Sequence, residues 1–203
     1  AGSGYVATRN GTKTLTIGGR NEDSTFSGAI LNSYSGGGSI VALTKVGTGT
    51  LTLNGTNSFN GGVSLDGGVL SVSTLAAGNT PCALGASLGT PGNLVFNGGT
   101  LRYTGPTVNG INRAFTLNAA GGTIDIADPA AAVQWTDASG AGPIIGVGGL
   151  TKTGPGTLWL ASANTYGGGT VISQGTLLVS NASALGGGAV TLNDSNTGAA
   201  DTA

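Results

Sequence analysis

The sequence of 203 residues contains no histidine and no methionine, and it has one cysteine and one glutamate. The absence of histidine excludes a Ser-His-Asp triad, a Cys-His dyad and most zinc sites. Seven basic and eight acidic residues give a net charge of −1. This is too little positive charge for a surface that binds nucleic acid. We therefore predict no catalytic residue, no metal and no cofactor.

Long apolar runs are also missing. The chain has no stretch of about 18 apolar residues that could cross a membrane as a helix, and no basic and apolar leader opens it. We expect no membrane insertion by this segment, and we expect any secretion signal to lie outside it. Cys82 cannot form an internal disulfide. We expect a free, partly buried thiol there, with an intermolecular disulfide as the alternative.

The residues that are abundant disfavour helices. Gly, Thr, Ser and Asn number 41, 28, 17 and 16 and together supply half of the chain. All four are poor or middling helix formers. Val, Ile, Leu and Phe nevertheless recur at short intervals, and the mean hydropathy is positive at +0.21. The chain therefore has enough apolar residues to form a packed core rather than a disordered coil.

An internal repeat is the strongest signal in the sequence. Residues 43–73 (LTKVGTGTLTLNGTNSFNGGVSLDGGVLSVS) align without a gap with residues 150–180 (LTKTGPGTLWLASANTYGGGTVISQGTLLVS) at an offset of 107, with 15 of 31 residues identical. We expect the shared residues to serve the structure. The shared positions that we single out are Lys45 and Lys152, Asn57 and Asn164, Gly49 and Gly156, and Gly62 and Gly169.

Between the glycines, apolar residues alternate with polar ones, as in Leu51 and Leu53 or Leu70 and Val72. Period two is typical of strands with one buried face. A sandwich is an alternative, but sequence-similar repeats, Gly- and Asn-rich corners and a small aliphatic core favour stacked coils. We predict an all-β fold, a right-handed parallel β-helix, with about 20–25 residues per coil, roughly nine coils and a length of about 40 Å.

Both copies of the repeat resemble the autotransporter-associated β-strand repeat, also called the passenger-associated transport repeat. The resemblance implies a β-helical passenger of a secreted bacterial surface protein, located outside the cell, and it implies no catalytic residues. Residues 1–203 are interpreted as one continuous solenoid segment, excerpted from a longer array because both ends stop within repeat-like strands.

Several residues are candidates for function. Lys45 and Lys152 are interpreted as outward strand residues that blunt sheet contacts. Asn57 and Asn164 are expected to bond backbone amides at the corners. Trp159 and Tyr166 lie close in the second copy and, with Trp135, are the candidate contacts for a glycan.

Asp125, Asp128 and Asp137 form the main carboxylate-bearing neighbourhood outside the repeats. Alternation directs Asp125 to solvent, and Asp128 precedes Pro129 as a turn residue would. Polysaccharide lyases and hydrolases on β-helices use carboxylate clusters, but no basic residue lies between Ile124 and Thr151. A catalytic site is therefore not expected there.

Three functional hypotheses follow. The first is a structural stalk or passenger segment that supports display or adhesion, with neighbouring repeats and the cell surface as partners. The second is a subunit of an extracellular fibre, assembled from identical chains by end-to-end strand pairing. The third is a β-helix that binds or processes carbohydrate. No nucleic-acid partner is expected.

Overall fold

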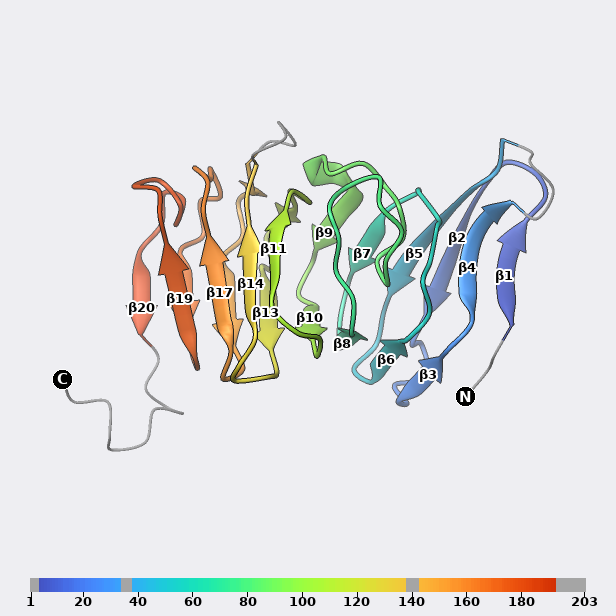
Figure 1. Ribbon diagram of the computed structural model, residues 1–203, viewed down its shortest axis with the longest axis horizontal. Coiled ribbons are helices and arrows are strands. Elements are labelled where there is room, and N and C mark those ends of the chain that lie inside the picture. Colours follow the sequence, from blue (N-terminus) through green and yellow to red (C-terminus); the bar gives the residue numbers. More distant parts are fainter. Residues whose placement is uncertain (1–3, 34–37, 138–142, 193–203) are drawn as a thin grey trace.

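The computed structural model describes residues 4–33, 38–137 and 143–192. Figure 1 shows a rod whose strands lie across its long axis, from the N-terminal coil on the right to the C-terminal coil on the left. Apart from one turn of 3-10 helix at Pro91–Asn93, the regular elements of the described residues are all strands. Every strand pairing is parallel. The all-β prediction is confirmed.

Three faces of the rod carry the strands. An eight-stranded sheet forms the lower face in Figure 1. Its strands are β3 (Ser24–Phe26), β6 (Thr50–Leu53), β8 (Val69–Val72), β10 (Thr100–Tyr103), β13 (Gly122–Ile126), β16 (Leu150–Thr153), β18 (Thr170–Ile172) and β20 (Val190–Leu192). A six-stranded sheet forms the far face. Its strands are β2 (Thr12–Ile17), β5 (Ile40–Lys45), β7 (Val63–Leu65), β9 (Leu94–Phe96), β12 (Thr116–Leu117) and β15 (Ile145–Gly146).

The near face is shared by two shorter sheets. A two-stranded sheet contains β1 (Tyr5–Thr8) and β4 (Ala29–Ser33). A four-stranded sheet contains β11 (Val108–Ile111), β14 (Ala132–Trp135), β17 (Thr157–Leu160) and β19 (Thr176–Val179). Between them, irregular backbone follows β6 and β8.

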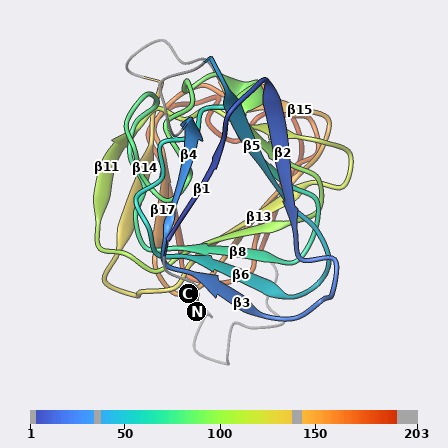
Figure 2. The same ribbon diagram turned by 90° about the vertical axis from the view of Figure 1, so that its right-hand side faces the viewer.

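The hand of the coil is visible along the axis. Figure 2 faces the N-terminal coil, and the chain rises along β1, descends along β2, crosses along β3 and rises again along β4. It therefore runs clockwise as it recedes from the viewer, which makes the coil right-handed, as predicted. The eight strands of the lower sheet indicate eight coils among the described residues, against about nine expected.

Coil length varies more than the sequence suggested. Leu51 pairs with Leu70, 19 residues later, whereas Leu70 pairs with Leu101, 31 residues later. The long coil contains residues 73–93, which form most of the irregular backbone on the near face. The extra length leaves the sheets in register, because the strands on either side still pair without a shift.

Inward-facing side chains stack in columns along the axis because paired strands keep the same alternation. In the eight-stranded sheet one column runs through Leu51, Leu70, Leu101 and Ile124, all buried. In the middle coils the interior also holds an aromatic stack. The ring centroids of Phe96 and Phe115 lie 5.1 Å apart, and those of Phe115 and Trp135 lie 5.7 Å apart. The core is thus one continuous column.

Candidate functional site

The two repeat lysines lie inside the rod rather than on its surface. Lys45 continues the inward column of Ile17 and Leu65 in the six-stranded sheet and is 1% exposed. Its ammonium nitrogen Nζ donates hydrogen bonds to the carbonyl oxygens of Val46 at 2.8 Å and of Gly47 and Gly67 at 3.3 Å. The prediction of an outward lysine is therefore wrong, because three corner carbonyls provide acceptors for the buried ammonium.

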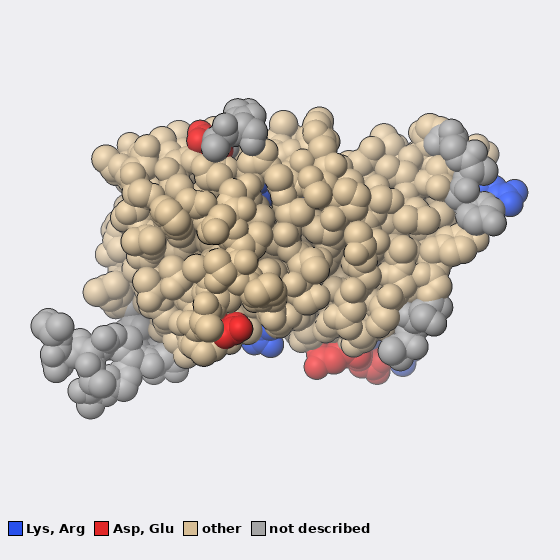
Figure 3. Space-filling view, in the orientation of Figure 1, with Lys and Arg blue, Asp and Glu red and all other residues tan. Residues whose placement is uncertain are grey.

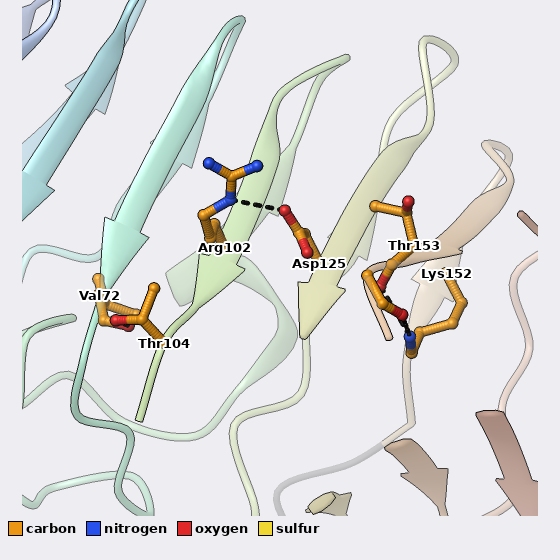
Figure 4. A network of polar contacts seen from close by, with 7 residues as sticks. Val72, Arg102, Thr104, Asp125, Lys152 and Thr153 are labelled. Atoms are coloured by element: carbon orange, nitrogen blue, oxygen red, sulfur yellow. Dashed lines mark hydrogen bonds and ion pairs between the residues drawn. The ribbon is translucent and has the colours of Figure 1, made fainter. Parts of the chain in front are cut away.

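Lys152 repeats this arrangement in β16. It is fully buried, and its Nζ donates to the carbonyl oxygens of Thr153 and Gly154 at 2.7 Å and of Gln174 at 3.1 Å. These acceptors are the residues that the alignment pairs with those of Lys45, 107 positions later. Figure 4 shows Lys152 turned to the Thr153 carbonyl at the end of its strand. In each repeat, the lysine thus lies inside the rod and its ammonium group bonds three backbone carbonyls at the adjacent corner. We call this arrangement a capped corner.

Burial affects the charge of these lysines. Desolvation lowers the pKa of Lys152 to about 8, and the nearby charge of Asp125 opposes the shift. Desolvation also lowers the pKa of Lys45, opposed by Asp23. A buried ammonium that donates to several carbonyls is stabilised by charge-assisted bonds, but it loses its hydration.

The two repeat asparagines clamp three successive coils together. The Asn57 side-chain oxygen Oδ1 accepts from the backbone nitrogen of Ile30 at 2.8 Å, and its Nδ2 donates to the carbonyl of Ala83 at 2.8 Å. Asn164 makes the same two bonds to its own neighbouring coils, at 2.9 and 2.7 Å. Both asparagines are buried. Because a buried backbone group without a partner is costly, the side-chain amide holds the irregular segment in register.

The four repeat glycines stand where a side chain would not fit. A Cβ atom on Gly49 would collide with the carbonyl of Glu22, and one on Gly156 would collide with that of Asp128. Gly62 and Gly169 adopt φ angles of +85° and +76°, in the left-handed region that disfavours other residues. These positions therefore allow close coil stacking at the corners.

The aromatic residues proposed as glycan contacts do not form one exposed platform. Tyr166 is fully buried, with its hydroxyl 2.6 Å from the Thr170 hydroxyl, and Trp135 is 3% exposed. The Trp135 nitrogen Nε1 donates to the carbonyl of Arg113 at 2.6 Å. Trp159 is partly exposed on the outer side of β17. A glycan contact at Trp159 stays a prediction, whereas the other two rings offer no face to solvent.

The carboxylates are dispersed. Asp125 lies on the outer side of β13, as alternation predicted. The prediction that it points to solvent is wrong, because it is 6% exposed and Arg102 covers it, with an Nε–Oδ2 distance of 2.6 Å (Figure 4). Asp128 is the expected turn residue, since its Oδ1 accepts from the Ala130 nitrogen at 2.9 Å. Asp137 accepts a bond from the Ser162 hydroxyl at 2.7 Å. Across the part of the chain that the structure describes, no three His, Cys, Asp or Glu side chains are grouped for a metal ion.

Arg113 is a buried residue that the sequence analysis missed. Its guanidinium fastens the segment that follows β8, with bonds to the carbonyls of Ala76 and Gly85 at 2.8 Å and of Thr80 at 3.0 Å. Cys82 lies in this segment as a free, buried thiol. No motif signals this arginine, because its acceptors, which are four backbone carbonyls and the Ser87 hydroxyl, lie 26 to 37 residues earlier in the chain.

Charge is sparse on the surface. Figure 3 shows only small groups of basic and acidic atoms on the face in view. Among the described residues, no helix has the length and apolar character needed to span a membrane.

Comparison with known proteins recovers the same two copies of the repeat. The family described as the passenger-associated-transport-repeat matches residues 43–72 and 150–179. Among curated proteins, the "Adhesin BmaC autotransporter" of Brucella suis biovar 1 (strain 1330) is 40% identical over 157 residues. The match covers 77% of this chain but only 4% of that relative's length. No solved structure matches the chain. The capped corners at Lys45 and Lys152 both lie within the matched ranges, and the chain contains two copies of the passenger-associated transport repeat.

Proposed function

We propose that this chain is a stiff β-helical segment of a secreted bacterial surface protein, which supports the display of other modules or adhesion. The observation that carries the proposal is the placement of the shared residues. Lys45, Lys152, Asn57 and Asn164 are all buried and satisfy backbone groups. The repeats thus specify the interior of a rod rather than a surface that would recognise a ligand.

The mechanism is mechanical. Each coil pairs its backbone with the coil before and the coil after, so stability grows with each neighbour added. An added coil buries its inward aliphatic residues and covers those of the previous coil. Stacking outside the cell would therefore favour outward movement of the chain. The relative named as an autotransporter adhesin supports an extracellular, cell-surface location and a non-enzymatic role for this segment.

The test uses the full-length parent protein, displayed on cells. Deleting residues 150–180, or substituting Lys152→Met together with Asn164→Ala, is expected to reduce the amount of passenger that extracellular protease or antibody can reach. Both changes break the capped corner, and the double substitution keeps the chain length.

The matched control is Lys13→Met, because Lys13 is exposed in β2 and serves no corner. Unchanged display of both altered proteins would contradict the role of the repeats in secretion. Reduced display of the control would show that the loss of a lysine, rather than the broken corner, is responsible.

End-to-end assembly into a fibre is the second candidate, and exposed apolar side chains on two outermost strands favour it. Among the described residues, β19 and β20 are the outermost strands of their sheets, and on them Val179, Val190 and Leu192 continue inward-facing positions of the preceding coil but are exposed. A second copy that paired with these strands would cover these side chains. Electron microscopy at high protein concentration would test this, since isolated particles would contradict it.

A further inference from the structure

The outer side of the eight-stranded sheet carries a shallow, open hollow, away from Trp159 on the four-stranded sheet. Strand alternation directs the lining side chains outward: Ile124 and Ile126 enter the core, so Asp125 between them faces the hollow. The polar residues that line it are Thr100, Arg102, Thr123, Asp125, Thr153 and Gln174.

The register of the sheet brings these groups together. Arg102 pairs with Asp125 across β10 and β13, and Asp125 pairs in turn with Thr153 of β16. Two residues earlier along the strands, and so on the same outward side, Thr100 pairs with Thr123. Two adjacent rows of polar side chains therefore cross three coils, on a sheet whose backbone is fixed by pairing on both sides.

The ion pair at the centre, between Arg102 and Asp125, is held rigidly, but not all N–H groups of Arg102 are used in it. The Asp125 side chain is 8% exposed and accepts the Nε–H of Arg102, whose own side chain is 45% exposed. Figure 4 shows the two terminal nitrogens of Arg102 turned away from Asp125. Within the described part of the chain, these nitrogens have no hydrogen-bond partner. A guanidinium that is oriented through Nε presents its remaining N–H groups in a fixed plane.

The charge of the hollow indicates the class of ligand. Arg102 and Asp125 are the only charged residues that line it, and their charges cancel. The other polar groups are threonine hydroxyls and the Gln174 amide, and the ring of Pro155 adds an apolar patch. A surface rich in donors and acceptors but without net charge is complementary to a neutral polyhydroxylated chain. It does not attract phosphate or another strong anion.

The hydroxyl-lined surface also continues beyond Arg102. A second shallow hollow lies on the same face and shares Arg102 with the first. Its lining includes Thr25, Thr52 and Ser71, which are paired in register across β3, β6 and β8. Asp23 adds one further charged side chain, which would disfavour an anionic ligand. A ligand that used both hollows would be extended and would run along the axis of the rod.

We propose that the outer face of the eight-stranded sheet binds a neutral oligosaccharide lengthwise, with Arg102 at the junction of the two hollows as the principal contact. This activity goes beyond the structural role proposed above, which does not require it. Loss of glycan binding would therefore leave the stalk function intact, and the two proposals fail in different experiments.

The test is a titration of the 203-residue chain, followed by NMR or calorimetry, with neutral hexasaccharides of glucose, xylose and N-acetylglucosamine and with polygalacturonate. We expect at least one neutral hexasaccharide to bind and Arg102→Gln to weaken that binding about tenfold or more, since bonds from a charged donor are lost. Arg20→Gln is the matched control, because Arg20 is exposed, lines neither hollow and likewise pairs through Nε with a carboxylate, that of Glu22, at 3.4 Å.

Trp159→Ala tests whether the oligosaccharide binds on the four-stranded sheet instead. We expect this substitution to leave the affinity for the oligosaccharide unchanged. The proposal is overturned if no neutral hexasaccharide binds at millimolar concentration, or if only polygalacturonate binds. It is also overturned if Arg102→Gln binds as well as the unaltered chain, or if Trp159→Ala is the variant that loses binding. Equal urea midpoints for all variants would show that the exposed substitutions leave the fold intact.

Discussion

The two copies of the repeat have nearly the same sequence pattern but occupy different faces of the rod. In the first copy the strands β5, β6, β7 and β8 alternate between the six-stranded and eight-stranded sheets. In the second copy β16, β17, β18 and β19 alternate between the eight-stranded and four-stranded sheets. The whole motif is thus advanced by one face around the axis. The motif thus specifies a capped corner with its flanking strands, and it forms this corner at two different edges of the rod.

The copies also differ in how deeply their last strand is buried. In the first copy Leu70 is fully buried and Val72 is 1% exposed, covered by the following strand β10. In the second copy the aligned residues are Leu177, partly buried, and Val179, 42% exposed. The sequence pattern is equivalent, so the difference comes from the neighbouring coil. Burial of a strand is therefore shared between successive coils, as in other stacked repeats.

The prediction with the largest expected effect tests whether the burial of a strand depends on the coil that follows it. Leu70→Ala should lower the free energy of unfolding by about 2–5 kcal/mol, because it leaves a cavity between two coils. Leu177→Ala should lower it by only about 1 kcal/mol, because part of that side chain already contacts water. Urea unfolding followed by circular dichroism measures both values. Equal losses for the two substitutions would contradict the dependence on a following coil.

Much of the fold was accessible from sequence because it depends on local patterns. Alternating aliphatic residues and Gly-rich corners predicted the parallel coils. The prediction of outward lysines was wrong, although strand alternation indicated the inward orientation. Leu43 and Lys45 are two residues apart and therefore share the inward side of β5. Hydrophobicity favours an outward lysine, but the alternation decides here because Gly47 and Gly67 turn their carbonyls to the ammonium.

Other features depend on contacts that a single sequence does not reveal. Coil lengths of 19 and 31 residues follow one another, so the offset of 107 between the copies does not indicate which face each one occupies. Arg113 fastens backbone carbonyls that lie 28 to 37 residues earlier in the chain. The hollow beside Arg102 depends on which residues pair across neighbouring strands. That pairing is known only once the structure gives the position of each coil.

The second prediction concerns how the free energy of unfolding depends on pH through Lys152 and through Lys45. The pKa of Lys152 is about 8 in the folded chain, below the ordinary lysine value of 10.5, so the unfolded chain binds more protons between these two pH values. The free energy of unfolding should therefore rise with pH above about 8, by at most about 1.4 kcal/mol per pH unit. Lys152→Met should flatten this rise, as measured by urea unfolding at intervals from pH 7 to 10.

Lys45→Met is the matched comparison, and it should flatten the rise less, since no shift as large is found at Lys45. Measurements stop at pH 10 because burial raises the pKa of Tyr166, and ionisation of that phenol would oppose folding at higher pH. A rise that is the same with and without Lys152 would contradict the assignment of this pH dependence to the buried corner.

The smallest effect is expected where the copies differ on the outer surface. Trp159 occupies the position of Thr52, and both side chains lie partly exposed on the outer side of their strands. Trp159→Thr removes a bond from Nε1 to the Ser180 hydroxyl, at 2.5 Å, between exposed groups. Because neither change touches the inward column, the free energy of unfolding should shift by about 0.5 kcal/mol or less in Trp159→Thr and in the reciprocal Thr52→Trp. A loss in urea unfolding as large as that of Leu70→Ala would show that the outer residues, too, specify the repeat.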